Sequence, residues 1–243
     1  PSSDGNKQVW TISCWVKRTE LSTNQMIWSA GDTYLHLVGG DNIQINLRPT
    51  STNYLWKSNA VFRDTGAWYH IVTRVNTQDS TVADRLRVYV NGEQLTTSLT
   101  SYQSNSGDTS WNSSAKAHHI GNYISGDYYM HGYVAEFHSI DGQSLGPGSF
   151  AETNADGEWV PKQYSGSYGS QGFYLDFADA DDLGDDESGN GNDFTESNIT
   201  SIDQAQDTPT NNFCTLNNNS RTNGNIRTTH GGTYVATDGG SGW

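Results

Sequence analysis

The stretch "WYHIVTRVNTQDSTVADRLRVYVNGEQL", residues 68–95, decides the fold class. It holds two runs rich in β-branched and aromatic residues on either side of a polar loop, a pattern typical of strands. In the second run Leu86, Val88 and Val90 share one face, because side chains alternate along an extended chain. Asn91-Gly92 then supplies two residues that accept positive φ, the strongest short signal for a β-hairpin. The stretch therefore predicts antiparallel strands joined by a tight turn.

The same alternation recurs on both sides of this stretch. In "WTISCWVKR" (10–18), four apolar side chains share a face: Trp10, Ile12, Cys14 and Val16. "YLHLVGGDNIQINL" (34–47) predicts a second hairpin, and three more short strands are expected in "HHIGNY" (118–123), "HGYVAEFHSI" (131–140) and "GFYLDF" (172–177), the last at a sheet edge. No segment keeps helical spacing for three turns. We therefore predict an all-β fold, a two-sheet antiparallel β-sandwich of the jelly-roll kind.

Composition narrows the function classes. Hydrophobic residues make up 33% of the 243 residues and aromatic residues 12%, enough large rings to bury a core and to argue against disorder. The net charge of −14 argues against nucleic acid as a partner, because a phosphate backbone needs clustered cations. It is compatible with divalent cations and neutral sugars. No apolar run has membrane-spanning length, so we expect no membrane insertion.

The ends of the chain suggest its organisation. We expect the jelly-roll domain over residues 1–200 and an extended arm, a linker or the start of a following module over residues 201–243, which are polar and weakly periodic. No secretory signal is visible, and the start at Pro1 suggests a fragment of a longer polypeptide. Pairing of Cys14 with Cys214 is left open.

Taken in order, five segments resemble the laminin-G-like, concanavalin-A-like jelly roll. They are "WTISCWVKR", "GAWYHIVTRV", "LRVYVNGEQL", "HHIGN" and "MHGYVAEFHSIDGQSL", and Gly132 to Phe137 match the G-x-[IV]-x-E-[VF] form of the family's last strand. The later "DGQSLGPGSFAETNADGEWVPKQYSGSYGSQGFYLDFAD", "LGDDESGNGNDFTESNI" and "DTPTNNFCTLN" are similar to a block that follows this jelly roll in virion proteins of marine bacteriophages. Those are often tail-fibre or appendage polypeptides.

This resemblance implies a non-catalytic module at the virion surface, outside the cell. It would sit on a fibre, an appendage or a capsid decoration and bind a host cell-surface glycan, neighbouring virion subunits, or both, as part of a homo-oligomer. Two rivals stay open: a purely structural assembly module, and a carbohydrate-active enzyme with an unfamiliar site.

The acidic loop "LGDDESGNGNDF" (183–194) has two interpretations. It fails as an EF-hand, because with Asp186 as the first position the twelfth would be Ser197 instead of a glutamate. Laminin-G-like modules often hold calcium at a sheet rim, and the resemblance makes calcium a candidate cofactor, with four candidate donors: Asp185, Asp186, Asn190 and Asp193. The alternative is a solvated loop whose side chains bond to its own backbone.

Two aromatic loops are candidates for carbohydrate binding. Sugar sites combine aromatic rings with Asp or Asn side chains that bond to hydroxyls. "SYQSNSGDTSWNSS" (101–114) and "GNYISGDYYMHG" (121–132) offer such a set: Tyr102, Trp111, Asn122, Tyr123, Asp127, Tyr128 and Tyr129. The alternative is that these rings pack at the ends of the sandwich or contact another subunit.

Catalysis and a zinc site are not expected. Concanavalin-A-like glycoside hydrolases carry Glu-x-Asp-x-x-Glu on one strand face, which this chain lacks, and Glu136 stands alone in its strand. His118 and His119 are adjacent in a strand, and His131 and His138 are an odd number of positions apart, so neither pair is expected to share a face. His70, on the Trp68 face, is expected to be a core or cross-strand residue.

Overall fold

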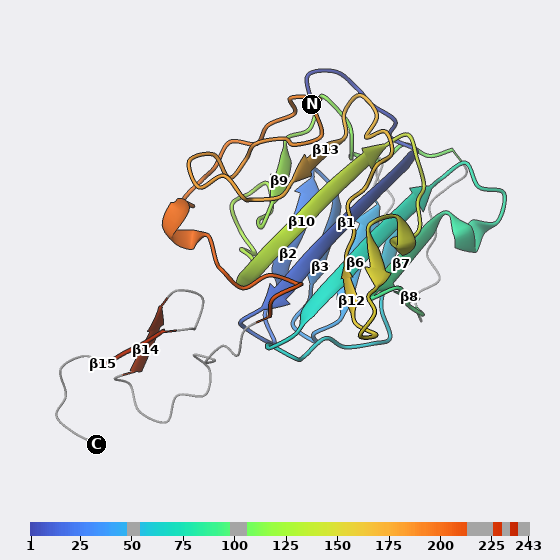
Figure 1. The fold of residues 1–243 in the computed structure, drawn as a ribbon. Coiled ribbons are helices and arrows are strands. Elements are labelled where there is room, and N and C mark those ends of the chain that lie inside the picture. Colours follow the sequence, from blue (N-terminus) through green and yellow to red (C-terminus); the bar gives the residue numbers. More distant parts are fainter. Residues whose placement is uncertain (48–53, 98–105, 213–225, 230–233, 238–243) are drawn as a thin grey trace.

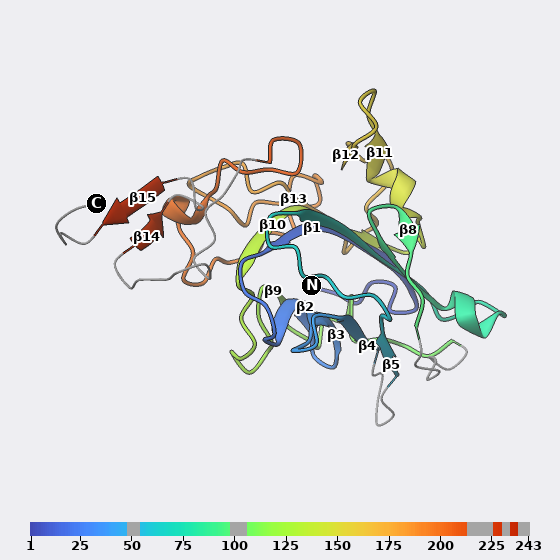
Figure 2. The same ribbon diagram turned by 90° about the horizontal axis from the view of Figure 1, so that it is seen from below.

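The computed structural model describes residues 1–47, 54–97, 106–212, 226–229 and 234–237. Two antiparallel sheets lie face to face, and Figure 2 shows them from below with the core between them. This confirms the predicted sandwich. Among the described residues no helix combines the length and the apolar character needed to cross a bilayer.

The larger sheet has six strands, and β10 and β1 lie side by side near its middle in Figure 1. In spatial order they are β13 (Phe173–Leu175), β10 (Gly132–Asp141), β1 (Val9–Arg18), β6 (Trp68–Asn76), β7 (Leu86–Val90) and β8 (Glu93–Gln94). The segment 172–177 thus provides the edge strand that was predicted, through the pairing of β13 with β10.

The smaller sheet has five strands. They are, in spatial order, β5 (Leu55–Lys57), β4 (Ile43–Leu47), β3 (Thr33–Leu37), β2 (Gln25–Ala30) and β9 (His118–Ile120). The remaining elements are two small hairpins and three short 3-10 turns: β11 (Ala151–Thr153) with β12 (Trp159–Pro161), β14 (Ile226–Thr229) with β15 (Tyr234–Thr237), η1 (Val82–Asp84), η2 (Pro147–Ser149) and η3 (Ser201–Asp203). The predicted hairpin over 34–47 is confirmed by the pairing of β3 with β4.

The turn after β7 has the geometry that its sequence requires. Asn91 and Gly92 adopt φ of 49° and 85°, the two positive values of a tight hairpin turn. The Asn91 side chain also accepts a hydrogen bond from the amide of His70 at 2.8 Å, which ties the turn to the neighbouring strand β6. The predicted turn is confirmed.

The core lies between the two sheets and is built around tryptophan. Trp10, Ile12, Cys14 and Val16 all point into it from β1, as the alternation predicted. Trp10 and Trp28 meet edge to face with ring centroids 5.8 Å apart, a favoured arrangement of aromatic pairs. Large rings thus compensate for the low aliphatic content.

The outer face of the large sheet is also covered. The hairpin β11–β12 lays Trp159 over this face, and the Trp159 indole donates a hydrogen bond to Nδ1 of His70 at 3.0 Å. His70 pairs with Trp15 across the strands and its ring stacks on that indole at 4.8 Å. This confirms His70 as a buried cross-strand residue and explains why β1 is buried on both faces.

A β-bulge interrupts β10. Ser13 pairs with His138 and Trp15 with Ala135, so Glu136 and Phe137 together face Cys14. The alternation of faces therefore shifts by one residue at this point. The prediction that His131 and His138 lie on opposite faces assumed one strand with strict alternation. That assumption is wrong, because β10 starts after His131 and contains the bulge.

The C-terminal segment returns to the sandwich. Lys17 Nζ lies 2.6 Å from Asp207, both side chains are buried at 1% and 2% exposure, and the same ammonium donates to Asn212 at 2.8 Å. Gln204 donates to the carbonyl oxygens of Phe177 and Ala178. Contacts with the sandwich thus continue past residue 200, and the domain boundary there stays a prediction. Cys14 is buried and is not in a disulfide, whereas Cys214 lies outside the described residues.

Gly172 precedes β13 where two backbones approach closely. A Cβ there would overlap the carbonyl oxygen of Tyr168 and lie 2.6 Å from that of Ser139. We expect Gly172→Ala to lower the free energy of unfolding by about 1–3 kcal/mol, because backbone atoms must move. Urea denaturation measures this loss. Gly148→Ala is the control, since nothing lies within 4 Å of its Cβ position; equal losses in the two variants would contradict the close approach.

Candidate functional site

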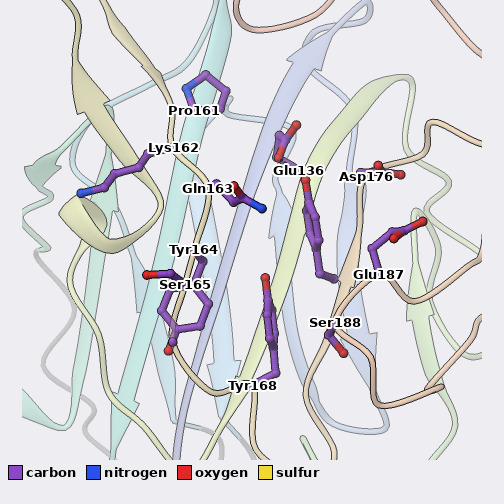
Figure 3. A pocket seen from close by; sticks show the side chains of 12 residues that line it. Glu136, Pro161, Lys162, Gln163, Tyr164, Ser165, Tyr168, Asp176, Glu187 and Ser188 are labelled. Carbon is purple, nitrogen blue, oxygen red and sulfur yellow. Dashed lines mark hydrogen bonds between the residues drawn. The ribbon is translucent and has the colours of Figure 1, made fainter.

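A hollow of about 630 Å³ opens on the outer face of the large sheet, beside its β13 edge. Its floor comes from β10 and β13, one wall from the segment after β12, and the other from the acidic loop after β13. Figure 3 shows the side chains that line it: Glu136, Pro161, Lys162, Gln163, Tyr164, Ser165, Tyr168, Tyr174, Asp176, Glu187 and Ser188. We call this the tyrosine hollow.

Glu136 is the most constrained residue of the tyrosine hollow. It stands at the bulge of β10 with φ of 50°, a conformation that is costly for a non-glycine residue and is concentrated at functional sites. Its carboxylate accepts a hydrogen bond from the Tyr174 hydroxyl at 2.6 Å. Burial raises the pKa of the Glu136 carboxyl above its usual value; the hydrogen bond from Tyr174 partly offsets this, and the nearby Asp176 charge adds to it. Strain, burial and a shifted pKa thus coincide at one side chain.

Stacked rings support Glu136. The Tyr174 ring lies parallel to His138, with centroids 4.2 Å apart, and the Tyr168 hydroxyl hydrogen-bonds His138 Nδ1 at 2.9 Å. Burial lowers the pKa of His138 to about 3, so this ring is neutral and does not compensate the Glu136 charge 3.9 Å away. Burial also raises the pKa of the Tyr174 hydroxyl, which therefore stays protonated and donates. The Glu136 carboxylate is therefore held by a hydrogen bond above a floor of stacked aromatic rings.

The tyrosine hollow carries acidic walls. Asp176 and Glu187 line it opposite the tyrosine segment. Lys162 directs its ammonium away from the centre, toward Glu152 at 3.8 Å and the Gly148 carbonyl at 3.5 Å (Figure 3). Such a site offers acceptors for hydroxyl groups and ring surface for apolar contact, and it repels anions.

A second hollow of about 700 Å³ runs between the edge strands β9 and β13, and residues 194–208 line its far side. Two of the predicted carbohydrate-binding residues, Asn122 and Tyr129, line it. The Tyr129 ring is 54% exposed. Asp176 lines this groove as well as the tyrosine hollow. We call it the edge groove.

The other predicted sugar residues take different places. Tyr128 is 50% exposed beside Tyr129 but does not line the edge groove. Tyr123 packs edge to face on Tyr34 at 5.5 Å, and Asp127 accepts a hydrogen bond from Ser125 at 2.8 Å. Tyr102 lies outside the described residues. The predicted set is therefore only partly brought together.

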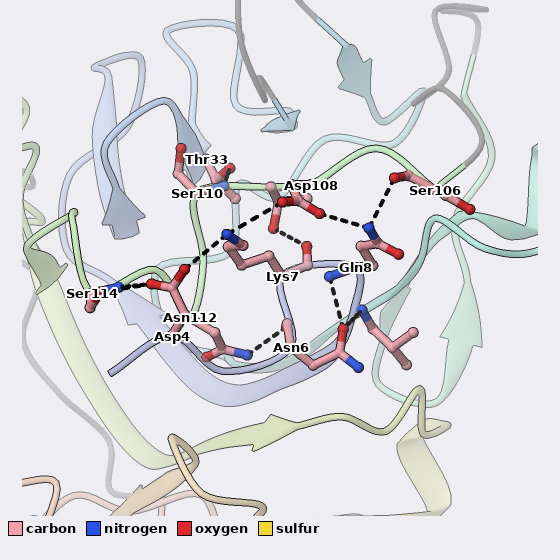
Figure 4. Close-up of polar contacts among 12 residues, drawn as sticks. Asp4, Asn6, Lys7, Gln8, Thr33, Ser106, Asp108, Ser110, Asn112 and Ser114 are labelled. Atoms are coloured by element: carbon pink, nitrogen blue, oxygen red, sulfur yellow. Dashed lines mark hydrogen bonds and ion pairs between the residues drawn. The ribbon is translucent and has the colours of Figure 1, made fainter. Parts of the chain in front are cut away.

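Trp111 is a correction. Its side chain is 0% exposed, its ring lies 5.1 Å from that of Trp28, and its indole donates to Ser139 at 3.0 Å, so it belongs to the core and offers no surface to a sugar. The loop that carries it is held down by the N-terminal segment (Figure 4). Asn112 donates to the Asn6 carbonyl at 3.0 Å, and several further bonds join the same two segments, among them Lys7 to Asp108 and Ser114 to Asp4.

The acidic loop is held in a turn by hydrogen bonds between its own side chains and backbone amides. Asp186 is buried and accepts hydrogen bonds from the amides of Tyr174, Ser188 and Asn192 at 2.8–2.9 Å. Two other predicted donors bond through their side chains: Asp193 accepts from the Asp186 amide, and Asn190 donates to the Gly169 and Gly172 carbonyls. Asp185 bonds through its backbone amide, which donates to the Asp182 carbonyl. Within the described residues no group of three or more His, Cys, Asp or Glu side chains is placed to hold a metal ion. Calcium stays a prediction, and the observed role of the loop is to fix β13 under the tyrosine hollow.

Residues 1–143 match the family model of the concanavalin A-like lectin/glucanases superfamily, in its laminin G form. The chain belongs to this superfamily. No curated protein matches the sequence. The match ends at the close of β10. Strand β13 and both walls of the tyrosine hollow, including the acidic loop, therefore lie outside the part of the chain that defines the superfamily.

Solved structures of the superfamily's fold are similar to the chain. One is a Bacteroides ovatus protein assigned as carbohydrate-binding, at 16% identity and a TM-score of 0.54, covering 76% of this chain and 50% of that one. The chain thus spans half the length of that protein. A sialidase CBM40 of Ruminococcus gnavus bound to sialyllactose (16%, TM-score 0.40, 54% and 82% covered) and mouse laminin α1 domains LG4-5 (16%, 0.41, 59% and 38%) are more distant. At these identities the similarity shows the fold.

The tyrosine hollow was not found from the sequence. Three of its tyrosines, Tyr164, Tyr168 and Tyr174, come from "YSGSYGSQGFY", a dense run of rings and small residues that could have been weighed beside the two aromatic loops. Glu136 was noticed only as an isolated acid. Its importance comes from the bulge, for which a single sequence carries no signal.

Proposed function

We propose that the chain is a non-catalytic carbohydrate-binding module whose ligand occupies the tyrosine hollow. The observation that carries this proposal is the Glu136 carboxylate, held by Tyr174 at 2.6 Å beside stacked rings in an open hollow. Sugars need this combination of hydroxyl acceptors and apolar ring surface. Membership of a superfamily of lectins and glucanases is consistent with it.

Binding is favoured over hydrolysis because one Glu136 oxygen is already bonded to Tyr174 and the carboxylate is braced from below by rings. A retaining or inverting glycosidase instead directs two carboxyl groups at one glycosidic bond. Release of reducing ends from a bound polysaccharide, lost in Glu136→Gln, would overturn the non-catalytic assignment.

The test is a glycan array with the full chain, followed by calorimetry on each hit. We expect Glu136→Gln to weaken binding about 10- to 100-fold, because a charge-assisted hydrogen bond contributes about 1.5–3 kcal/mol. Glu93→Gln is the matched control, since this exposed glutamate on β8 lies outside the hollow. Equal affinities of the two variants would contradict the assignment. An array with no hit, together with stable self-association, would favour the structural assembly module instead.

We propose further that the module is displayed on a bacteriophage virion as part of a homo-oligomeric fibre, appendage or capsid decoration. The similarity of the segments after β10 to virion polypeptides supports this setting. Light scattering on the full chain tests the oligomer, and antibody labelling of virions from a phage that encodes the chain tests the location. A monomer, or unlabelled virions, would contradict the corresponding part.

A further inference from the structure

The tyrosine hollow and the edge groove are neighbours across one short strand. Tyr174 of β13 faces the hollow, Leu175 and Phe177 line the groove, and Asp176 lines both. Because β13 is the last strand of its sheet, no further strand separates the two. The two cavities therefore share Asp176 as a common lining residue.

We propose that one linear glycan crosses the β13 edge at Asp176, with one part of the chain in the tyrosine hollow and the next in the edge groove. The ligand is then a stretch of linear glycan long enough to reach both cavities. This inference rests on the proposed function and specifies its ligand. The volumes of about 630 and 700 Å³ each fall in the range of about 300–1,000 Å³ typical of ligand pockets.

The edge groove has the chemistry to take the second part of the chain. Tyr129 offers a half-exposed ring and Asn122 comes from the same loop. Across the groove, the Gln204 side chain bonds to the Phe177 and Ala178 carbonyls at 2.8 and 2.9 Å, which fixes that wall to the end of β13. The edge groove thus offers an aromatic ring and an amide side chain beside a fixed polar wall. Like the tyrosine hollow, it combines ring surface with polar groups that can bond to hydroxyls.

The charge of the two cavities selects the class of glycan. The acids that line them are Glu136, Asp176, Glu187, Glu196 and Asp203, besides Asp207, whose charge is neutralised by Lys17. Among the described residues that line the two cavities, the only lysine or arginine is Lys162, whose ammonium points away from the hollow. Carboxylates close to a bound uronate or sulfate would repel it. The glycan is therefore neutral.

The experiment uses ladders of neutral linear oligosaccharides, from the disaccharide to the octasaccharide, cut from β-1,3-glucan, β-1,4-glucan, β-1,4-mannan and β-1,4-xylan. Calorimetry on the full chain should show affinity that rises with length for the ladder that binds. Tyr129→Ala should weaken the longest member about tenfold, through loss of ring contact, and leave the shortest member unchanged. Glu136→Gln should weaken short and long members alike.

Tyr128→Ala is the matched control, because Tyr128 is exposed to the same extent on the same loop but lies outside the groove. Affinity that does not rise with length, or equal losses in the Tyr128 and Tyr129 variants, would overturn the inference while the Glu136 effect still supports the proposed function. Binding of only an acidic or branched glycan on the array would also overturn it. If Glu136→Gln has no effect on any binding ladder, both fail.

Discussion

Lys17→Met is expected to lower the free energy of unfolding by about 3–5 kcal/mol, because it leaves the Asp207 carboxylate buried without its cation. Lys17 and Asp207 lie 2.6 Å apart and are nearly inaccessible to solvent, and Lys17 also donates to Asn212. A charge removed from water without a partner is among the most costly changes that one substitution can make. Urea denaturation of the full chain, followed by tryptophan fluorescence, measures the loss.

The double variant Lys17→Met with Asp207→Leu separates loss of the ion pair from loss of packing. It should recover most of the stability, because an apolar pair of similar volume often replaces a buried ion pair without loss. Lys116→Met, at an exposed lysine, is the control and should change stability by less than about 0.5 kcal/mol. A Lys17→Met loss as small as the control's would show that residues 204–212 do not pack on the sandwich in solution.

Acid is expected to destabilise the fold through its buried histidines: burial lowers the pKa of His36 and His118 to about 4, and the shifts of His70 and His138 are larger. Burial lowers the pKa of both His70 and His138 from 6.5 to about 3. Below pH 6.5 these two histidines therefore bind protons in the unfolded chain but not in the folded chain. The stability contributed by the neutral rings is complete above pH 6.5 and is lost as the pH falls, by on the order of 3 kcal/mol per ring near pH 4.

The free energy of unfolding, measured by urea denaturation at a series of pH values from neutral to about 4, checks this slope. His138→Gln should lower the slope by close to one proton, because it removes one of the rings that are buried in the neutral form. Glu136, whose pKa burial raises, contributes stability that is lost as the pH rises through its folded pKa, which gives a smaller slope of opposite sign. A flat profile for the unmodified chain would contradict neutral burial of the two rings.

Local patterns were sufficient to predict the sandwich. Alternation in β1, β6 and β7, and the Asn91-Gly92 turn, depend on residues close in sequence and carry their own signal. The edge position of β13 was also predicted, because a strand that follows a long crossing has few partners left.

Features that depend on distant partners could not be predicted. Trp111 sits among serines and asparagine, as loop residues do, yet the N-terminal segment closes over it. The sequence around Asp207 is typical of a solvated acid, because its partner Lys17 lies 190 positions away in the chain. The bulge at Glu136 has no local signature, and it reverses the side-chain order that the sequence implied. Most of the candidate site depends on contacts of this kind.

The Lys17–Asp207 contact also determines how tension would enter the molecule. A pull applied beyond residue 212 reaches Asn212 and then Asp207, both of which are bonded to Lys17, and passes through Lys17 into β1. That strand is hydrogen-bonded to β10 on one side and to β6 on the other. As long as the Lys17 contacts hold, the load falls on a central strand that is hydrogen-bonded on both sides, and not on the edge strand β13.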